Sequence, residues 1–310
     1  MTLTELRYIV AVARERHFGR AAEACFVSQP TLSVAVRKLE EELGVTLFER
    51  ARNEVSVTLV GERIVAQASR ILEETAAIRI LAQQGRDQLS APLRLGAIYT
   101  IGPYLLPKLV PRLHAMAPHM PLVVEENYTA RLSERLRQGE LDAIIVALPF
   151  EVPGVVTRVL YHEPFVVALP VSHRWSRRKA IAATELAGEN LLLLGAGHCF
   201  RDQVLDACPG CSRSAQVEGE IQQTVEGSSL ETIRYMVASG IGITVLPCSA
   251  TATDRQARKM LAIRPFRKPA PGRHVVLAWR GSFPRPRAIE VLEQAILACR
   301  HPCAGEKAKD

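Results

Sequence analysis

Apolar residues near the start of the chain recur at helical spacing. Over residues 2–16 they fall three or four positions apart, which predicts a helix with an early threonine as its N-cap. Residues 20–25 form a second short helix, and Ser28 caps a third, which begins at Gln29 or Pro30. Two helices joined by a tight turn, the second polar on one face, predict a helix-turn-helix unit.

The next two segments complete this N-terminal unit. Residues 45–58 have the pattern of a short β-ribbon around Arg52 and Asn53, which is typical of a wing. A long helix then runs from Thr58 to about Leu89, with apolar residues near heptad spacing. The N-terminal domain is too small to bury the whole apolar face of this helix. We therefore expect the helix to pair with that of a second copy of the chain.

After residue 90 the pattern changes to strands that alternate with helices. The order strand, helix, strand, helix, strand predicts an α/β domain with a parallel sheet. Its elements are the strands 93–98, 121–127 and 141–148 and the helices 105–116 and 130–138. The later elements are the strands 163–171, 189–194, 241–247 and 273–280 and the helices 228–240 and 286–300.

These elements divide the chain into domains. We expect a helix-turn-helix domain with a wing over 1–58, a dimerisation linker helix over 59–89, a first regulatory lobe over 90–162 and 268–300, a second lobe that holds Cys199 and Cys208 over 163–267, and a tail over 301–310.

The charge of the chain does not locate a binding face. The 310 residues carry a formal net charge of +7, which favours an anionic partner. Residues 1–90, however, hold twelve basic and twelve acidic residues, whereas 255–287 hold ten basic residues and no acidic one. A run of charge is usually a solvated face, and we interpret the late stretch in this way.

Composition also indicates a compartment. The first residues lack the pattern of a signal peptide, and no apolar run approaches the length of a membrane span. Seven cysteines, an odd number, do not match a secreted disulfide framework. We therefore expect a cytoplasmic protein, away from membranes, whose thiols are reduced at rest.

Three of the cysteines lie within residues 195–211. Cys199 directly follows His198, and the helical spacing after it places Cys199 at or just before a helix N-terminus. Helix N-termini and cationic neighbours both favour the thiolate, the reactive form of cysteine. A free cysteine is more often a buried, inert residue, but the positions of His198 and Arg201 favour a reactive Cys199.

Cys208 lies nine residues after Cys199. A continuous helix of that length separates the two Cα atoms by about 13 Å, whereas a disulfide needs them within about 7 Å. A bridge between these cysteines therefore requires the segment to unwind. A bond that requires local refolding is a candidate switch.

A third thiol, Cys211, forms a Cys-Pro-Gly-Cys motif with Cys208. That spacing occurs in redox pairs and in half of a zinc site. No matching second ligand pair lies elsewhere, so we expect neither a metal nor a cofactor. Cys211 could compete as the resolving thiol, exchange with Cys208 or have no role, and the last is our default interpretation.

Several polar residues follow predicted strands. Ligands of open α/β sheets bind beyond the carboxyl ends of strands and at helix N-termini. Thr100 follows the first strand of the sheet, Thr129 follows the second, and His198 and Cys199 follow the strand 189–194. These segments could converge on one crevice.

Long motifs connect the chain to a known family. FGRAAEACFVSQPTLSVAVRKLEEELGVTLFER (18–50) resembles the DNA-binding region of LysR-type transcriptional regulators. Further segments resemble one group within that family, the OxyR-type hydrogen-peroxide sensors. These segments are IGPYLLPKLVP (101–111), GHCFRDQ (197–203), SSLETIRYMVASGIGITVLP (228–247) and the Cys199–Cys208 interval. The resemblance covers nearly the whole chain. It implies a winged helix-turn-helix and a linker helix, followed by a two-lobed α/β regulatory domain like a periplasmic binding protein.

The resemblance also implies a mechanism. The Cys199 thiolate would attack peroxide and become a sulfenic acid, and Cys208 would resolve it as a reversible intramolecular disulfide. The residues that orient peroxide and activate the thiolate in this group correspond here to Thr100, Thr129, His198, Asp202 and Arg273. Taken alone, each of these is more often a cap, a turn residue or a surface charge.

For DNA the resemblance points to the recognition helix and the wing. The corresponding residues are Gln29, Pro30, Thr31, Ser33 and Arg37 at the helix, with Arg50 and Arg52 contacting phosphates from the wing. The implied partners are double-stranded promoter DNA, hydrogen peroxide, RNA polymerase and a thioredoxin- or glutaredoxin-type reductant. A homodimer that assembles into a homotetramer is also implied.

Three alternatives compete with a redox-sensing regulator that is not an enzyme. The first is a LysR-type regulator controlled by a small-molecule effector, with incidental cysteines. The GHCFRDQ stretch and the Cys199–Cys208 interval argue against it. The second is a thiol peroxidase, against which the complete helix-turn-helix argues. The third is a ligand-binding transport protein, which the missing export signal disfavours.

Overall fold

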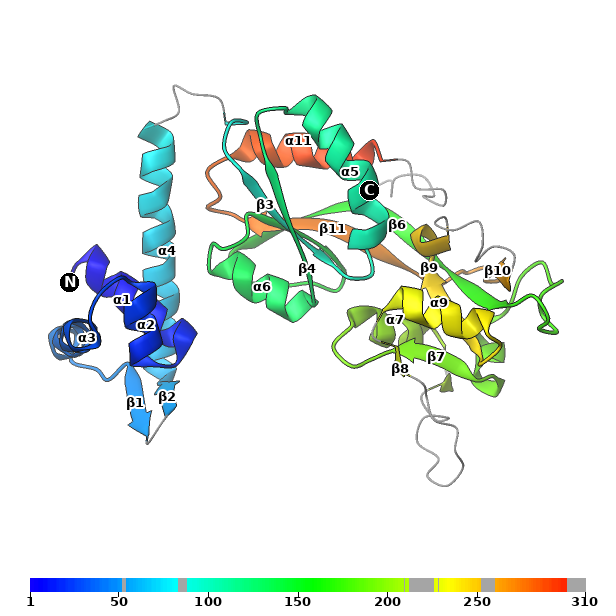
Figure 1. Cartoon of the computed structure of the whole chain (residues 1–310), viewed down its shortest axis with the longest axis horizontal. Helices are drawn as coiled ribbons and strands as arrows, with labels where there is room; N and C mark the ends of the chain where they lie inside the picture. Colours follow the sequence, from blue (N-terminus) through cyan, green and yellow to red (C-terminus); the bar gives the residue numbers. More distant parts are fainter. Residues whose placement is uncertain are drawn as a thin grey trace. The chain divides into compact units, whose positions relative to one another are not determined.

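The computed structural model describes residues 1–51, 54–82, 88–208, 210–211, 226–227, 229–251 and 260–299. The chain divides into two compact units, Met1–Arg86 and Asp87–Asp310 (Figure 1). The first is built around one hydrophobic core and the second around two. Within the described ranges, none of the helices combines the length and the apolar character that crossing a membrane requires.

The first unit is the predicted helix-turn-helix with a wing. Side chains fix the starts of its helices: Thr2 forms a capping box with Glu5, and Ser28 caps the third helix. The second helix begins two residues earlier than predicted, because His17 caps it by accepting the Arg20 N–H. The elements are α1 (Leu3–Glu15), α2 (Phe18–Ala24), α3 (Gln29–Leu43), the antiparallel strands β1 (Phe48–Ala51) and β2 (Glu54–Val57), and α4 (Leu59–Ala82).

The long helix α4 begins close against the wing. A Cβ added at Gly61 would lie 2.3 Å from the Leu47 carbonyl oxygen, so this approach requires glycine. α4 is described as far as Ala82, whereas Leu89, its predicted end, lies in a turn. That turn belongs to the second unit, where the Arg285 guanidinium donates to the carbonyl oxygens of residues 88, 91 and 92.

The described strands of the second unit form a nine-stranded sheet in the order β4-β3-β5-β11-β6-β9-β7-β8, with β10 paired to β6. β3 pairs in parallel with both β4 and β5, which confirms the predicted parallel arrangement of these three strands. Figure 1 shows α6 on one side of them, and α5 with α11 on the other. The elements are β3 (Leu93–Ile98), α5 (Gly102–Met116), β4 (Leu122–Asn127), α6 (Thr129–Arg137), β5 (Ala143–Ala147) and α11 (Pro286–Leu297).

Two long strands make the sheet mixed rather than parallel throughout. β6 (Val155–Pro170) and β11 (Gly272–Arg280) pair in antiparallel fashion, and β11 also pairs antiparallel with β5. β6 begins eight residues before the predicted strand, and the exposed Val156 and Val159 among its first residues lie outside the cores of both lobes. The remaining elements are β7 (Leu191–Leu194), α7 (Cys199–Ala207), β8 (Glu226–Gly227), α9 (Leu230–Ala238), β9 (Ile243–Pro247), β10 (Leu261–Pro265) and the 3₁₀ turns Ala183–Gly188 and Cys248–Thr251.

The second unit has two separate cores, which define its two lobes. Lobe I packs β3, β5 and β11 against α5 and α11. Lobe II packs β7 and β9 against α7 and α9. Strand β6 contributes Leu160 and Tyr161 to the first core and residues 165–169 to the second, so it joins the two lobes.

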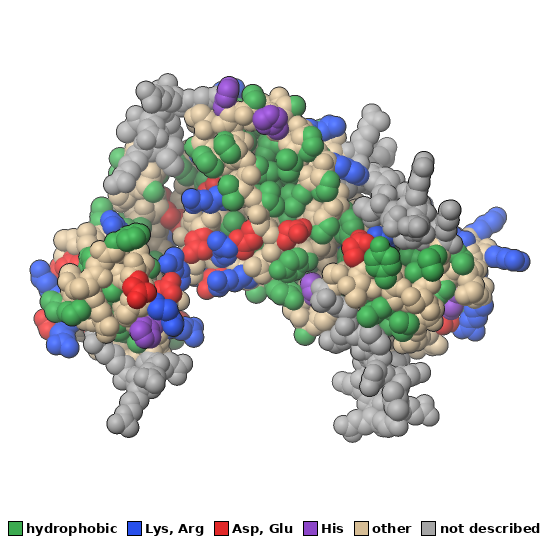
Figure 2. All heavy atoms as spheres, in the orientation of Figure 1, with side chains coloured by type: hydrophobic (Ala, Val, Ile, Leu, Met, Phe, Trp, Pro, Cys, Tyr) green, Lys and Arg blue, Asp and Glu red, His purple; other side chains and the backbone are tan. Residues whose placement is uncertain are grey.

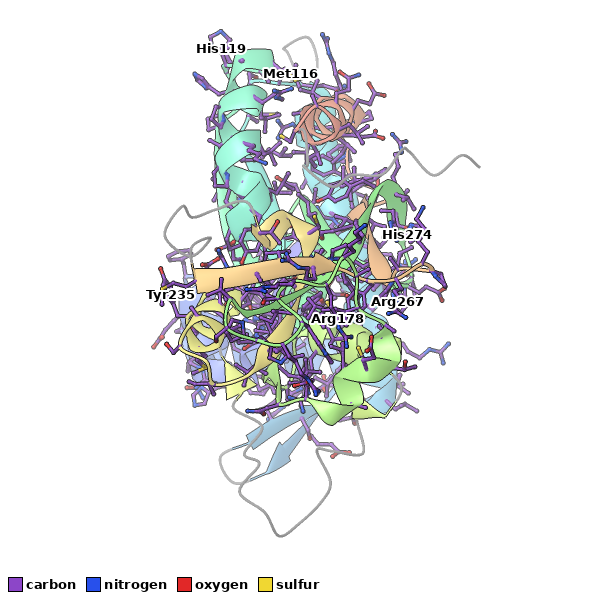
Figure 3. All side chains as sticks on the ribbon, turned by 90° about the vertical axis from the view of Figure 1, so that its right-hand side faces the viewer. Met116, His119, Arg178, Tyr235, Arg267 and His274 are labelled. Atoms are coloured by element: carbon purple, nitrogen blue, oxygen red, sulfur yellow. The ribbon has the colours of Figure 1, made fainter. Side chains whose placement is uncertain are left out.

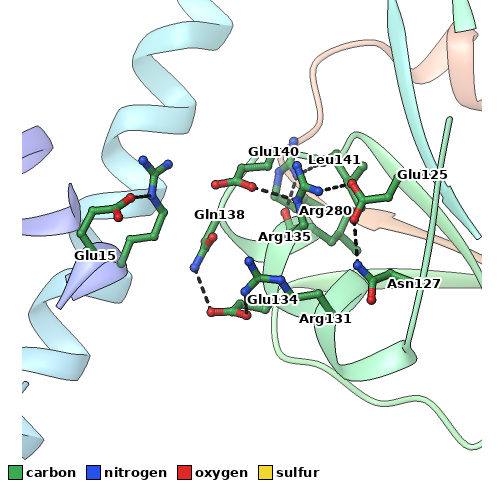
Figure 4. A network of polar contacts seen from close by, with 12 residues as sticks. Glu15, Glu125, Asn127, Arg131, Glu134, Arg135, Gln138, Glu140, Leu141 and Arg280 are labelled. Atoms are coloured by element: carbon green, nitrogen blue, oxygen red, sulfur yellow. Dashed lines mark hydrogen bonds and ion pairs between the residues drawn. The ribbon is translucent and has the colours of Figure 1, made fainter. Parts of the chain in front are cut away.

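The basic stretch 255–287 is not a solvated face throughout, which corrects our expectation. Arg273, Arg280 and Arg285 are buried. Arg280 donates to two backbone carbonyl oxygens at and after the end of α6, beside the ion pairs of Arg135 (Figure 4). These side chains satisfy backbone groups inside the fold, which a count of charges along the sequence cannot reveal.

Exposed basic residues gather at one end of lobe II. Arg178 and Arg267 are exposed and lie on segments that the Ile181–Phe266 bridge joins (Figure 3). The surface over α6 differs from this end of lobe II, because acidic and basic side chains are mixed there (Figure 2). Arg131 pairs with Glu134 on this surface.

Candidate functional site

Three segments of the second unit meet at a small pocket that is partly open to solvent. One follows β3, one follows β4, and one leads into α7. Because β3 and β4 are parallel neighbours, their carboxyl ends lie at the same edge of the sheet. The expected convergence of these segments is confirmed, and the pocket is lined by Ile98, Tyr99, Thr100, Asn127, Tyr128, Thr129, Gly197, His198 and Cys199.

Cys199 is the first residue of α7 and carries a free, partly exposed thiol. Thr129 Oγ1, at the start of α6, lies 3.6 Å from the Cys199 Sγ and donates a hydrogen bond to it. The residue before it, His198, is the N-cap of α7 but makes no side-chain capping bond. The first backbone N–H groups of α7, beside Cys199, therefore receive no side-chain cap from His198.

Three aromatic rings lie beside the thiol. The His198 ring centroid is 4.7 Å from that of Tyr128 and 6.0 Å from that of Tyr99, and the two tyrosine rings are 5.3 Å apart. Gly197 directly precedes His198 and has a φ of +94°, a conformation that residues with a side chain rarely adopt. Sequence reasoning missed both tyrosines, although each directly precedes a threonine that it did identify.

Arg273 is completely buried and reaches the pocket through Thr100. Its Nε and Nη2 lie 2.9 and 2.8 Å from Glu163 Oε2, so its charge is paired. Its Nη1 donates to Thr100 Oγ1 at 2.8 Å and its Nη2 to the Thr100 carbonyl oxygen at 2.9 Å. Since Thr100 Oγ1 accepts from Arg273, its own hydrogen is available to donate into the pocket.

Contacts with both lobes hold α7 in place. Phe200 packs edge-on against Phe165 in the lobe II core, with the Arg273 guanidinium 5.2 Å from its ring centroid. Gln203 Nε2 donates to the Leu148 carbonyl oxygen, 2.9 Å away, just after β5 of lobe I. Of the sequence-predicted residues, Asp202 lies exposed in the first turn of α7, and neither it nor Arg273 nor Cys208 lines the pocket.

The other cysteines of the segment lie at the opposite end of α7. Cys208 is the C-cap of the helix, and both Cys208 and Cys211 are free and buried in the lobe II core. Their thiols are hydrogen-bonded to each other. The expectation that all thiols are reduced is wrong for Cys248, which is disulfide-bonded.

The recognition helix α3 presents a polar face. Leu32, Val36 and Leu39 are fully buried. The predicted DNA contacts Gln29, Pro30, Thr31 and Arg37 are exposed, and Ser33 is half-buried. Arg50 lies in β1, in register with Val55, and Arg52 lies outside the described residues. Sequence reasoning missed Phe26, which is 96 % exposed at φ +58° in the turn before α3.

Comparison with known families accounts for nearly the whole chain. Residues 3–62 match the model of the bacterial regulatory helix-turn-helix proteins of the lysR family, and residues 86–298 match the LysR substrate binding domain. The chain belongs to the LysR family of transcriptional regulators. This confirms the resemblance found in the sequence and the expected fold class.

Within that family the chain is similar to OxyR proteins. The chain is 40 % identical over 298 residues to the DNA-binding transcriptional dual regulator OxyR of Escherichia coli, covering 96 % of this chain and 95 % of that one. A full-length OxyR variant of Pseudomonas aeruginosa is 58 % identical, with a TM-score of 0.79 over 97 % of this chain and 99 % of that one. A hydrogen-peroxide-bound OxyR mutant of Corynebacterium glutamicum is 33 % identical, with a TM-score of 0.62 over 96 % and 94 %.

Proposed function

We propose that this chain regulates transcription in response to hydrogen peroxide, with Cys199 as the thiol that peroxide oxidises. The observation that carries the proposal is the position of Cys199, at an uncapped helix N-terminus and 3.6 Å from the Thr129 hydroxyl, in a small pocket. The relatives support it, since several are named hydrogen peroxide-inducible genes activators.

The first step is a nucleophilic displacement at the pocket. The Cys199 thiolate attacks one peroxide oxygen, the O–O bond breaks, and the sulfur becomes a sulfenic acid while hydroxide leaves and takes up a proton to become water. The hydroxyls of Thr129 and Thr100 and the ring of His198 line the space in which the peroxide would be oriented. Arg273 acts through Thr100, whose hydroxyl it fixes.

The second step is the disulfide between Cys199 and Cys208, with loss of water. These residues stand at the two ends of α7, whose nine residues hold their Cα atoms about 13 Å apart. The bridge requires the Cα atoms within about 7 Å, so α7 must unwind. Because α7 packs against both lobes, its unwinding would change the regulatory unit as a whole.

DNA recognition falls to the exposed face of α3. Gln29 and Arg37 have the donors and acceptors that read base edges, and Thr31 and Ser33 can bind bases or phosphates. Phe26, exposed in the preceding turn, is suited to an apolar contact with a thymine methyl group. Arg50 and Arg52 of the wing would bind phosphates. Pro30 lies in the first turn of α3, beside Gln29 and Thr31, and would contact the DNA there.

Apolar residues on α4 support assembly into a dimer. Leu59 is 81 % exposed and Ile78 is 64 % exposed on the same helix. Such residues are buried when two copies of a helix pair. We further propose a tetramer of two such dimers, contact with RNA polymerase, and reduction by a thioredoxin- or glutaredoxin-type protein in the cytoplasm.

The proposal treats the chain as a stoichiometric sensor, not as an enzyme. It also keeps the boundaries of the lobes at residues 162 and 267, which the two cores of the second unit support, and the end of the wing at residue 58, whereas Leu89 belongs to the lobe I core and not to the linker helix. An apolar-lined effector pocket is the second candidate, and the polar groups converging on Cys199 argue against it.

The experiment that tests the function compares DNA binding in two redox states. Reduced and peroxide-treated protein would each select duplexes from a random pool, and the selected duplexes would be used as templates for transcription with bacterial RNA polymerase. We expect specific duplexes and a change in transcript level on oxidation. Selection without any effect of peroxide on binding or transcription would contradict the proposal.

Replacing Thr129 with valine is expected to slow the oxidation of Cys199 about ten- to a hundredfold. The change keeps the shape of the side chain but removes a hydrogen bond to a charged group, which contributes about 1.5–3 kcal/mol. Stopped-flow measurement of thiol loss checks this, with Thr129→Ser as the matched control that keeps the hydroxyl. An unchanged rate in Thr129→Val would exclude Thr129 from activation of the thiol.

Replacing Arg37 with alanine is expected to weaken binding to the selected duplex about five- to a hundredfold, while binding to random duplex changes little. A bidentate contact to guanine contributes about 1–3 kcal/mol of discrimination. Fluorescence anisotropy on both duplexes measures the difference, with the exposed Arg7→Ala on α1 as control. An equal loss on both duplexes would assign Arg37 to a phosphate instead.

A further inference from the structure

Cys208 and Cys211 are arranged for a bond with each other. The Cys211 N–H donates to the Cys208 carbonyl oxygen at 3.0 Å, which closes a four-residue turn directly after α7. In such a turn the first and last Cα atoms lie within about 7 Å. The two thiols are also hydrogen-bonded, in a site that excludes solvent.

This geometry differs from that of the Cys199–Cys208 pair. A bridge from Cys199 requires α7 to unwind, whereas a bridge between Cys208 and Cys211 satisfies the distance requirement with α7 intact. Two disulfides therefore compete for Cys208. The Cys208–Cys211 bridge is compatible with the packing of α7 against both lobes, and the Cys199–Cys208 bridge is not.

The order of the bonds assigns their roles. In the reduced protein the hydrogen bond between the two thiols, together with burial, raises the pKa of Cys208, and the same bond lowers the pKa of Cys211. Once Cys208 is bridged to Cys199 it has no hydrogen to donate, and Cys211, whose Cα the turn holds within about 7 Å of that of Cys208, is the thiol placed to attack it as a thiolate.

We propose that Cys211 is a second resolving thiol, which takes Cys208 from the Cys199–Cys208 disulfide and leaves a Cys208–Cys211 disulfide with a free Cys199. This deepens the proposed function and rests on it. The Cys211 thiolate attacks the Cys208 Sγ, the bond between Cys199 and Cys208 breaks, and Cys199 leaves as a thiolate.

The electron balance of the whole sequence is closed. Peroxide is reduced to two molecules of water, and the dithiol of Cys208 and Cys211 is oxidised by two electrons to a disulfide. Cys199 ends in the state in which it began, and α7 can refold. The Cys199–Cys208 state is thereby limited in time without any external reductant.

A consequence concerns the second molecule of peroxide. Once Cys208 is held by Cys211, Cys199 can be oxidised to a sulfenic acid again but has no resolving partner. Repeated exposure therefore drives Cys199 up the oxidation ladder to the sulfinic acid, which thiols do not reverse. The Cys-Pro-Gly-Cys motif would separate a response to one pulse from the response to sustained peroxide.

The test is a time course on the full-length reduced protein. One equivalent of peroxide is added, samples are quenched by an alkylating reagent, and tryptic peptides are mapped by mass spectrometry. Cleavage after Arg201 places Cys199 on one peptide and both Cys208 and Cys211 on the next. A bridge to Cys199 therefore links two peptides, whereas the Cys208–Cys211 bridge lies within one and lowers its mass by two hydrogens.

We expect the linked peptides to appear first and then to decline as the internal bridge grows, with Cys199 becoming alkylatable again. In Cys211→Ser the linked peptides should persist, and in Cys299→Ser, which removes a buried cysteine of lobe I, the decline should be as in the unmodified chain. The time course of the unmodified chain decides the question even if Cys211→Ser does not fold.

Other outcomes overturn the proposal at different points. Linked peptides that persist beside an alkylatable Cys211 would refute the exchange and leave the sensor function intact. A Cys199–Cys211 bridge as the first product would make Cys211 the direct resolving thiol. No oxidation of Cys199 at all would refute the proposed function, and the exchange with it.

Discussion

Cys199→Ser protein should lose its reaction with hydrogen peroxide, with thiol loss falling to the level of the remaining cysteines. A serine hydroxyl is similar in shape to the thiol but remains protonated, so it cannot supply the thiolate nucleophile that attacks peroxide. Stopped-flow mixing with peroxide, followed by titration of free thiols, measures the effect.

The control for this prediction is Cys25→Ser in the first unit. Cys25 is free and only partly buried, as Cys199 is, but burial raises its pKa and so disfavours its thiolate. Its replacement should leave the rate unchanged. A full rate in Cys199→Ser, or a lost rate in Cys25→Ser, would move the reactive thiol elsewhere.

Arg273→Leu should reduce the free energy of unfolding of the regulatory unit by about 3–5 kcal/mol, because it leaves the Glu163 carboxylate buried without its partner. It should also slow the oxidation of Cys199, since the Thr100 hydroxyl loses the donor that orients it. Chemical denaturation monitored by fluorescence measures the first effect, and stopped-flow mixing the second.

The double variant Arg273→Leu/Glu163→Leu separates charge from packing. Removing both ions leaves no uncompensated charge, so we expect it to recover most of the lost stability, apart from the hydrogen bond that Glu163 accepts from the Ser249 N–H. The slow oxidation should remain, because Thr100 still lacks its donor. Additive losses in the double variant would show that the two residues do not act as a pair.

Much of the architecture follows from local patterns. Caps such as Ser28 and the 3.6-residue spacing define the helices of the first unit, and the alternation of strands and helices defines the parallel part of lobe I. The pocket was also predictable, because the ends of parallel strands share an edge. Thr100 and Thr129 follow two such strands, and the structure brings both to Cys199.

Other features depend on contacts between residues far apart in the sequence. The antiparallel strands β6 and β11 lie more than a hundred residues apart, and no local pattern records their pairing. Arg273 reads as one charge in a basic stretch, yet it is buried against Glu163 on β6. The hydrogen bond between Cys208 and Cys211 likewise appears only once the turn after α7 is seen.

The first disulfide formed in Cys211→Ser protein reveals the partner of Cys199, because exchange with Cys211 cannot occur there. The reduced variant would receive one equivalent of peroxide, be quenched at the earliest time that shows reaction, and be mapped by mass spectrometry. We expect peptides linked between Cys199 and Cys208, and we expect them to be absent when Cys199 is also replaced. A protein whose Cys199 remains fully alkylatable after peroxide treatment would contradict it.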